Sequence, residues 1–146
     1  MRYLFFLLSI ALISVVPSEA QVTGYYRQPA ISGDQIVFNA EGDLWSVSRS
    51  GGVAQRITTH AGQEAWPTIS PDGQWIAFSA SYEGAADTYV IPIIGGTPNR
   101  ISWDGSRPVG WTPDGHVISR TSKYAGLPDT HLVVIDPATG KTTPGF

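Results

Sequence analysis

Three histidines and several carboxylates are the residues of this sequence that could take part in catalysis or bind a metal. His60 and Glu64 stand four residues apart, a spacing that suits a metal pair only on one helix face or on two rigid strands. The small and polar residues around them are typical of a loop, so we expect no metal there. His116 follows a turn and His131 belongs to an alternating run, and both are expected to be ordinary strand residues.

Asp72 and Asp114 occupy equivalent turns, where two roles are open. A calcium loop needs several oxygen ligands at close spacing, whereas each aspartate here can cap its own turn, and we favour the caps. No serine stands in a Gly-x-Ser-x-Gly turn, the strained turn that exposes a catalytic nucleophile. No complete Gly-x-x-x-x-Gly-Lys-Ser/Thr phosphate loop occurs either. We therefore assign no catalytic, metal or cofactor-binding residue and expect no cofactor.

The composition excludes several classes of protein. The chain has 146 residues, no cysteine and a formal net charge of -3. Disulfide frameworks and cysteine zinc sites are therefore excluded, and no basic surface for nucleic acid is indicated. Hydrophobic residues make up 42% of the chain, which is too many for a disordered polypeptide. We expect one domain, or part of one.

Residues 1–20 have the pattern of a secretory signal peptide. Arg2 precedes an apolar run over residues 4–16, and Pro17 and the small residue Ala20 follow. A membrane anchor is the alternative, but the run is shorter than the roughly 20 apolar residues that span a bilayer. We expect cleavage after Ala20 and a secreted or periplasmic mature chain of residues 21–146.

The rest of the sequence is a repeat with a period of about 40 residues. Each copy opens near a proline, and these prolines are Pro29, Pro67 and Pro108. A short apolar run, an alternating segment and a glycine turn follow in each copy. The turns at 70–73 and 112–115 read Ser/Thr-Pro-Asp-Gly, in which proline presets φ, aspartate bonds to the backbone and glycine adopts a positive φ.

Four short strands in each repeat are typical of a β-propeller blade. A β-sandwich also has a strand in about every 8–12 residues, but the matching turns favour the propeller. The predicted fold is all-β: a partial β-propeller of about three four-stranded antiparallel blades, preceded by the signal peptide. We place the blades at residues 25–60, 61–103 and 104–146.

Three blades do not close a ring, because propellers typically have 4–8 blades. The simplest expectation is that the chain is the N-terminal piece of a longer protein. Two chains that assemble into a six-bladed ring are the alternative. An open blade edge also favours self-association, since its backbone groups are unpaired.

Five tryptophans are distributed over the repeats. Trp45 and Trp75 are expected in the core, because they lie on strands in register with apolar positions. Trp66, Trp103 and Trp111 fall near strand entries and loops. These three are the candidates for a peptide path, since tryptophan is favoured at binding hot spots.

Several segments carry a resemblance to a known family: residues 25–38, 41–47, 50–58 and the Val-Gly-Trp-Thr-Pro-Asp-Gly turn at 109–115. There the sequence resembles the start of bacterial tricorn protease homologues, over essentially all of residues 21–146. The resemblance implies N-terminal propellers that admit and filter peptides, followed by a PDZ domain and a serine-peptidase domain. The family's catalytic residues lie in that C-terminal part, so none is carried over to this chain.

The sequence therefore predicts an N-terminal propeller fragment of a tricorn-like serine peptidase. Its expected role is substrate gating or protein interaction, with peptides or proteins as partners and proteolysis in downstream domains. A TolB-like periplasmic propeller that acts as a non-enzymatic protein-binding scaffold is the alternative. The propeller of a prolyl-oligopeptidase-type enzyme is a third hypothesis, and all three classes share the Ser-Pro-Asp-Gly turn.

Overall fold

Twelve strands in three sheets make up the part of the chain that the computed structural model describes, residues 25–122 and 130–145. The first sheet contains β1 (Arg27–Ser32), β2 (Gln35–Ala40), β3 (Asp43–Ser48) and β4 (Gln55–Arg56). The second contains β5 (Glu64–Ile69), β6 (Trp75–Ala80), β7 (Asp87–Pro92) and β8 (Asn99–Arg100). The third contains β9 (Arg107–Trp111), β10 (Val117–Thr121), β11 (His131–Ile135) and β12 (Thr142–Pro144).

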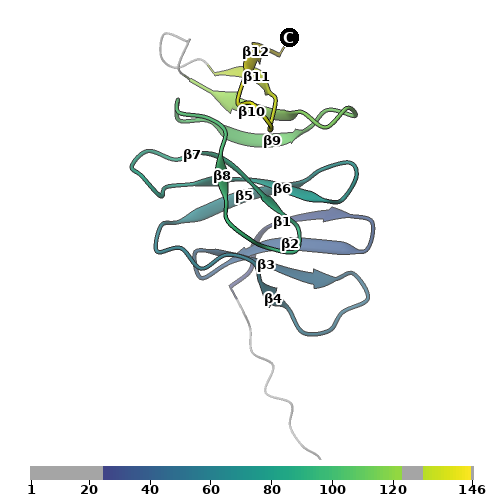
Figure 1. The fold of residues 1–146 in the computed structure, drawn as a ribbon. Helices are drawn as coiled ribbons and strands as arrows, with labels where there is room; N and C mark the ends of the chain where they lie inside the picture. Colours follow the sequence, from purple (N-terminus) through teal and green to yellow (C-terminus); the bar gives the residue numbers. More distant parts are fainter. Residues whose placement is uncertain (1–24, 123–129, 146) are drawn as a thin grey trace, which may run out of the picture.

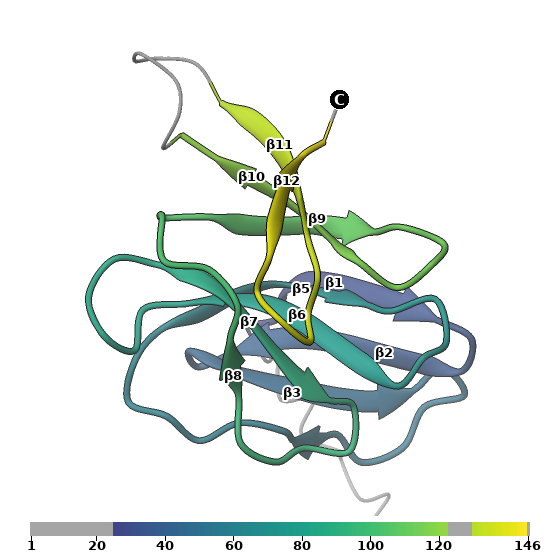
Figure 2. The same cartoon turned by 45° about the horizontal axis from the view of Figure 1, so that its top comes forward.

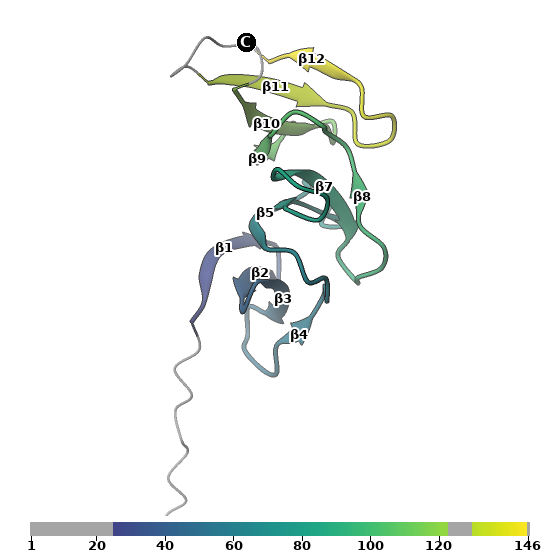
Figure 3. The same cartoon turned by 90° about the vertical axis from the view of Figure 1, so that its left-hand side faces the viewer.

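Each sheet is an antiparallel meander in which strands adjacent in sequence pair. The three sheets are stacked from purple to yellow in Figure 1. Figure 2 shows how strongly the third sheet twists, because β12 runs almost across β9. Figure 3 shows the first strands β1, β5 and β9 on one side and the last strands on the other. This arrangement confirms the predicted all-β fold of three four-stranded blades of a partial propeller.

The turn between β5 and β6 forms as its sequence predicts. Gly73 donates its backbone N–H to the carbonyl oxygen of Ser70 at 2.9 Å, and its φ of 70° lies in the region that favours glycine. Asp72 Oδ1 accepts hydrogen bonds from Ser70 Oγ at 2.6 Å and from the Gln74 N–H at 3.0 Å. Asp72 therefore caps its own turn.

Two apolar clusters fill the spaces between neighbouring sheets. The middle sheet contributes to both, because successive residues of a strand point to opposite faces. On β6, Ile76 and Phe78 join the cluster shared with the first sheet, and Ala77 joins the cluster shared with the third. All three side chains are fully buried. The middle sheet is thus covered on both faces, and burial of these faces holds the blades together.

An aspartate at the start of the third strand recurs in the first two blades. Asp43 pairs with Arg56, and Asp87 pairs with Arg100. Asp87 also accepts a hydrogen bond from the Gly105 N–H at 2.9 Å, which ties the second blade to the chain entering the third. These contacts give both aspartates an architectural role.

The N-terminal 24 residues lie outside the described part of the chain. The predicted signal peptide and its cleavage after Ala20 therefore stay predictions. Residues 123–129, within the predicted third blade, also lie outside it. Over residues 25–122 and 130–145, no helix has the length and apolar character needed to cross a membrane.

Candidate functional site

The first strands of the three sheets carry the same element, a variable residue followed by proline. Because β5 packs between β1 and β9, the three elements lie together on the side of the sheets formed by these strands (Figure 3). A groove of about 310 Å³ is found there and is called the inner groove. It is lined by Gln28, Pro29, Trp66, Pro67, Thr68, Arg107, Pro108 and Val109.

The residue–proline steps interrupt the pairing of the first strand with the second. The register shifts at this step in both β1 and β5, because proline has no N–H to donate to the ladder. Gln28 and Trp66 adopt positive φ angles of 51° and 58°, which cost a non-glycine residue roughly 1–2 kcal/mol. Such bulges re-aim side chains, and here the two side chains line the inner groove.

Consecutive contacts join the equivalent residues of the three blades. The backbone N–H of Trp66 donates a hydrogen bond to Gln28 Oε1 at 2.9 Å, which links the second blade to the first. The Arg107 guanidinium carbon lies 4.0 Å from the centre of the Trp66 ring, a cation–π contact that links the third blade to the second. Trp66 is nevertheless 43% exposed, and Val109 beside it is 45% exposed.

The inner groove is equipped for binding rather than for proton transfer. The described residues that line it include no carboxylate or histidine, the side chains most often used in general acid–base catalysis. Arg107 Nε is buried and has no hydrogen-bond partner among the described residues. An indole face, an amide and a guanidinium together suit an extended peptide, whose carbonyl oxygens accept hydrogen bonds and whose side chains pack on the ring.

The structure separates the five tryptophans differently from the prediction. Trp66 lines the inner groove, and Trp103 is 65% exposed elsewhere. Trp111 instead packs against the second apolar cluster. Trp45 is half-buried, but the core placement of Trp75 is wrong, since its side chain is 44% exposed. Trp75 is the first residue of β6 and lies beyond the part of the sheet that its neighbours cover.

His60 and Glu64 do not come together as metal ligands. The His60 ring packs against the Tyr82 ring, with centres 3.9 Å apart. The Glu64 carboxylate is turned into the protein, where it accepts hydrogen bonds from the Thr58 and Tyr82 hydroxyls and from the Leu44 N–H at 3.1 Å. Glu64 is thus a buried tie between the first two blades. Nothing in its sequence surroundings indicated this role.

The environment of Glu64 changes its acidity. Burial raises the pKa of the Glu64 carboxyl, and the hydrogen bonds from Thr58 and Tyr82 offset part of the rise. Burial and the neighbouring Glu64 also raise the pKa of the Tyr82 hydroxyl. The cluster therefore favours neutral groups between the blades, and its effect should appear in the pH dependence of stability.

The other residues singled out from the sequence lie in turns and on strands. His116 Nδ1 lies 3.1 Å from Asp114 Oδ2, and His131 is exposed at the start of β11. Hydrogen bonds from Ser70 to Asp72, and from Thr112 to Asp114, lower the pKa of each aspartate. Within the described ranges, no three His, Cys, Asp or Glu side chains gather as a metal site.

Gln28 and Arg107 were not singled out from the sequence, although they line the inner groove. The available signal was their position immediately before the repeated proline, equivalent to that of Trp66. Three different residue types stand at this one repeat position. This indicates that the fold requires the backbone conformation there but not a particular side chain.

Comparison with known proteins agrees with this structure. The family model described as the tricorn protease N-terminal beta propeller domain matches residues 23–145. Tricorn protease homolog 1 of Streptomyces coelicolor is 36% identical over 91 residues, which cover 60% of this chain and 8% of that protein. The chain therefore spans less than a tenth of this relative.

Two solved structures have the same fold over most of the chain. The crystal structure of the tricorn protease matches with a TM-score of 0.72 and 25% identity, over 83% of this chain and 13% of that one. A structure named "putative TolB" from Agrobacterium tumefaciens also matches with a TM-score of 0.72, at 26% identity, over 83% of this chain and 46% of that one. The family match extends over nearly all of the described residues, and the repeat, the blades and the turn motifs agree with it. The chain belongs to the tricorn protease N-terminal β-propeller family.

Proposed function

We propose that the inner groove binds extended peptides that pass along the axis of a propeller to which this chain contributes three blades. The observation that carries the proposal is the line of contacts between equivalent residues of the three blades, Gln28, Trp66 and Arg107. It presents hydrogen-bonding and aromatic groups on an exposed face. Binding through the peptide main chain is tolerant of sequence, which suits a filter that must pass many substrates.

In this proposal, the chain gates access and does not cleave peptides. Peptide hydrolysis belongs to a PDZ-linked serine-peptidase part of a longer protein, as the family membership supports. The lack of carboxylates and histidines around the inner groove is consistent with a passage that holds a peptide without reacting with it. The partners of the chain are then peptides and the downstream domains.

Peptide binding by the full chain tests the gate. The probe is a fluorescein-labelled decapeptide of Ala, Leu and Glu, capped at both ends, and the readout is fluorescence anisotropy. Trp66→Ala and Arg107→Gln should each weaken binding about tenfold, since each removes a direct contact worth roughly 1–2 kcal/mol. Trp103→Ala, at an exposed tryptophan outside the inner groove, is the control and should bind like the wild type. Equal binding by all four proteins would refute the proposal that the inner groove binds peptides.

A protein-binding scaffold without peptidase activity is the second candidate. The Agrobacterium tumefaciens structure supports it, because the protein named putative TolB matches this chain with the same TM-score of 0.72 as the tricorn protease. A scaffold binds a folded partner through its loops, whereas a gate binds unfolded peptides through the inner groove. Binding that survives both groove substitutions and requires a folded partner would favour the scaffold.

Export from the cytoplasm is part of the proposal. It is supported by the positive start, apolar run and small residues of the first 20 residues. N-terminal sequencing of the protein from fractionated cells tests it. A mature chain that begins at Gln21 in the secreted or periplasmic fraction is the expected result, and retention of Met1 in the cytoplasm would contradict it.

A further inference from the structure

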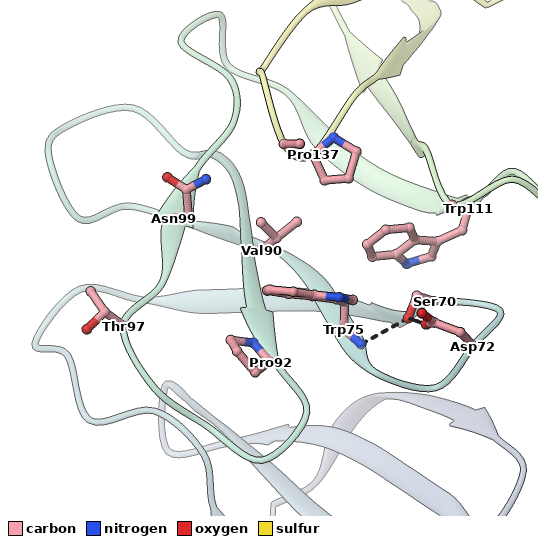
Figure 4. A pocket seen from close by; sticks show the side chains of 11 residues that line it. Ser70, Asp72, Trp75, Val90, Pro92, Thr97, Asn99, Trp111 and Pro137 are labelled. Atoms are coloured by element: carbon pink, nitrogen blue, oxygen red, sulfur yellow. Dashed lines mark hydrogen bonds between the residues drawn. The ribbon is translucent and has the colours of Figure 1, made fainter.

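A second pocket lies between the second and third blades and shares no lining residue with the inner groove. Its volume is about 540 Å³, within the range typical of ligand sites. Residues from β6, β7, β8 and the end of β9 surround it, together with the turn that follows β11 (Figure 4). It is called the interblade pocket.

Two tryptophans give the interblade pocket its aromatic character. Trp75, from the start of β6, is 44% exposed and lies beside Val90 and Pro92 (Figure 4). Trp111, from the end of β9, is held in place because its Nε1 donates a hydrogen bond to the Thr68 carbonyl oxygen at 3.2 Å. The pocket therefore has one anchored indole and one indole that remains accessible to a ligand.

The charge of the interblade pocket is negative. Asp72 is the one ionisable residue among those that line it. Its Oδ1 accepts the two hydrogen bonds of the turn, which leaves Oδ2 available to a ligand. The same hydrogen bonds lower the pKa of Asp72, so its carboxylate is ionised at neutral pH. No lining residue carries a compensating positive charge.

The neighbouring pair of blades shows that the architecture does not require this aromatic pair. The register of the first and second strands makes Gln35 the counterpart of Trp75, and Ile69 the counterpart of Trp111. The junction between the first and second blades therefore has an amide and an aliphatic side chain where the next junction has two indoles. The tryptophans are a departure from the repeat that the fold itself does not explain.

We propose that the interblade pocket binds an arginine side chain of an extended peptide segment in a partner. A guanidinium stacks on an indole face and donates charge-assisted hydrogen bonds to a carboxylate oxygen, here Asp72 Oδ2, and its apolar stem packs against Val90 and Pro92. Trp75 supplies the accessible face and Asp72 supplies the charge. This site is separate from the inner groove, because the two have no lining residue in common. The decapeptide that tests the inner groove also contains no arginine, so the two proposals are tested independently.

The test measures binding of two capped tripeptides to the full chain by the shift of tryptophan side-chain NMR signals. One is Gly-Arg-Gly, and the other has neutral citrulline in place of arginine. The arginine peptide should bind at least tenfold more tightly than the citrulline peptide. Trp75→Gln, which places the first blade's residue here, and Asp72→Asn should each weaken arginine binding at least tenfold.

Matched controls are available at equivalent or similar positions. Asp114→Asn alters the same turn in the third blade, and Trp103→Gln removes another exposed tryptophan; both should bind like the wild type. Equal affinity for the two peptides, or unchanged binding by Trp75→Gln, would overturn the proposal, as would tighter binding of a proline-only tripeptide. If Trp75→Gln does not fold, the comparison of the arginine and citrulline peptides on the wild-type chain still tests whether the pocket binds arginine.

Discussion

Trp111 Nε1 and the carbonyl oxygen of Thr68 are joined by a hydrogen bond of 3.2 Å across 43 residues of sequence. The bond connects the first strands of the second and third blades. These strands belong to different sheets, so no backbone ladder pairs them. The ring also packs against the apolar cluster between these blades. One side chain thus contributes both an apolar and a polar contact to the blade junction.

Trp111→Phe separates these two contributions, because phenylalanine keeps a ring in the cluster but cannot donate the hydrogen bond. We expect the free energy of unfolding to fall by about 1 kcal/mol, measured by urea denaturation. Trp103→Phe is the control and should have almost no effect, since Trp103 is 65% exposed. Equal stabilities of Trp111→Phe and the wild type would show that the hydrogen bond does not stabilise the junction.

The two aspartate–arginine pairs should differ in their effect on stability. Asp87 is buried and also accepts the Gly105 N–H, whereas Asp43 Oδ1 is buried with no hydrogen-bond partner among the described residues. Replacing one partner of a buried pair costs about 3–5 kcal/mol, so Asp87→Ala should be strongly destabilising. Asp43→Ala should cost distinctly less, because its arginine is more exposed. Urea denaturation of both variants tests this order, and the reverse order would contradict it.

Glu64 should make stability depend on pH in an unusual direction. Its pKa in the folded chain is raised above the ordinary value of 4.5, so above that pH the folded state binds more protons than the unfolded state. The contribution to the free energy of unfolding is therefore full at acid pH and is lost as pH rises through the raised pKa. Glu64→Gln removes the titrating group and should flatten this decline.

The measurement is the urea midpoint of the wild type and Glu64→Gln at a series of pH values from acid to neutral. Glu83→Gln is the control, because the Glu83 side chain is 72% exposed, and it should keep the wild-type profile. Other carboxylates also titrate, so the difference between the two profiles is the relevant quantity. A constant difference across the series would show that Glu64 titrates alike in both states.

Gly62 is required by close packing within the second blade, where the segment before β5 lies against the residue that follows β6. A Cβ at this position would lie 2.7 Å from the backbone oxygen of Ser81, and the backbone must shift to relieve the clash. Gly62→Ala should therefore lower the free energy of unfolding by roughly 1–3 kcal/mol. Gly110→Ala is the control, since nothing lies within 4 Å of its Cβ position. Comparable stabilities of the two variants in thermal denaturation would contradict the packing argument.

The fold could be predicted because its information is local and repeated. The turn at Ser70–Gly73 contains the proline, aspartate and glycine that its geometry requires, and equivalent turns recur. Ile76 and Phe78 alternate along β6 and lie on one face of it, as the alternation of a strand requires. The same reasoning failed at Trp75, because alternation says which face a residue occupies but not whether a neighbouring sheet extends far enough to cover it.

The candidate sites were only partly accessible from the sequence. Trp66 was noticed as a tryptophan near a strand entry, but its contacts with Gln28 and Arg107 depend on bulges in strands that are far apart in sequence. The residues around Glu64 predicted a loop. In the structure its carboxylate is buried and accepts hydrogen bonds from hydroxyl groups of two blades. Such contacts require the packing of whole blades, which a single sequence does not specify residue by residue.

Photo-crosslinking tests the central claim, that peptides bind at the inner face of the blades, most directly. A benzoylphenylalanine replaces either Val109, in the inner groove, or Val53, which is 91% exposed in the loop between β3 and β4. The labelled acidic decapeptide is added and irradiated, and adducts are measured by mass spectrometry. We predict adducts from position 109 and almost none from position 53. Adducts from position 53 without adducts from position 109 would contradict the peptide gate.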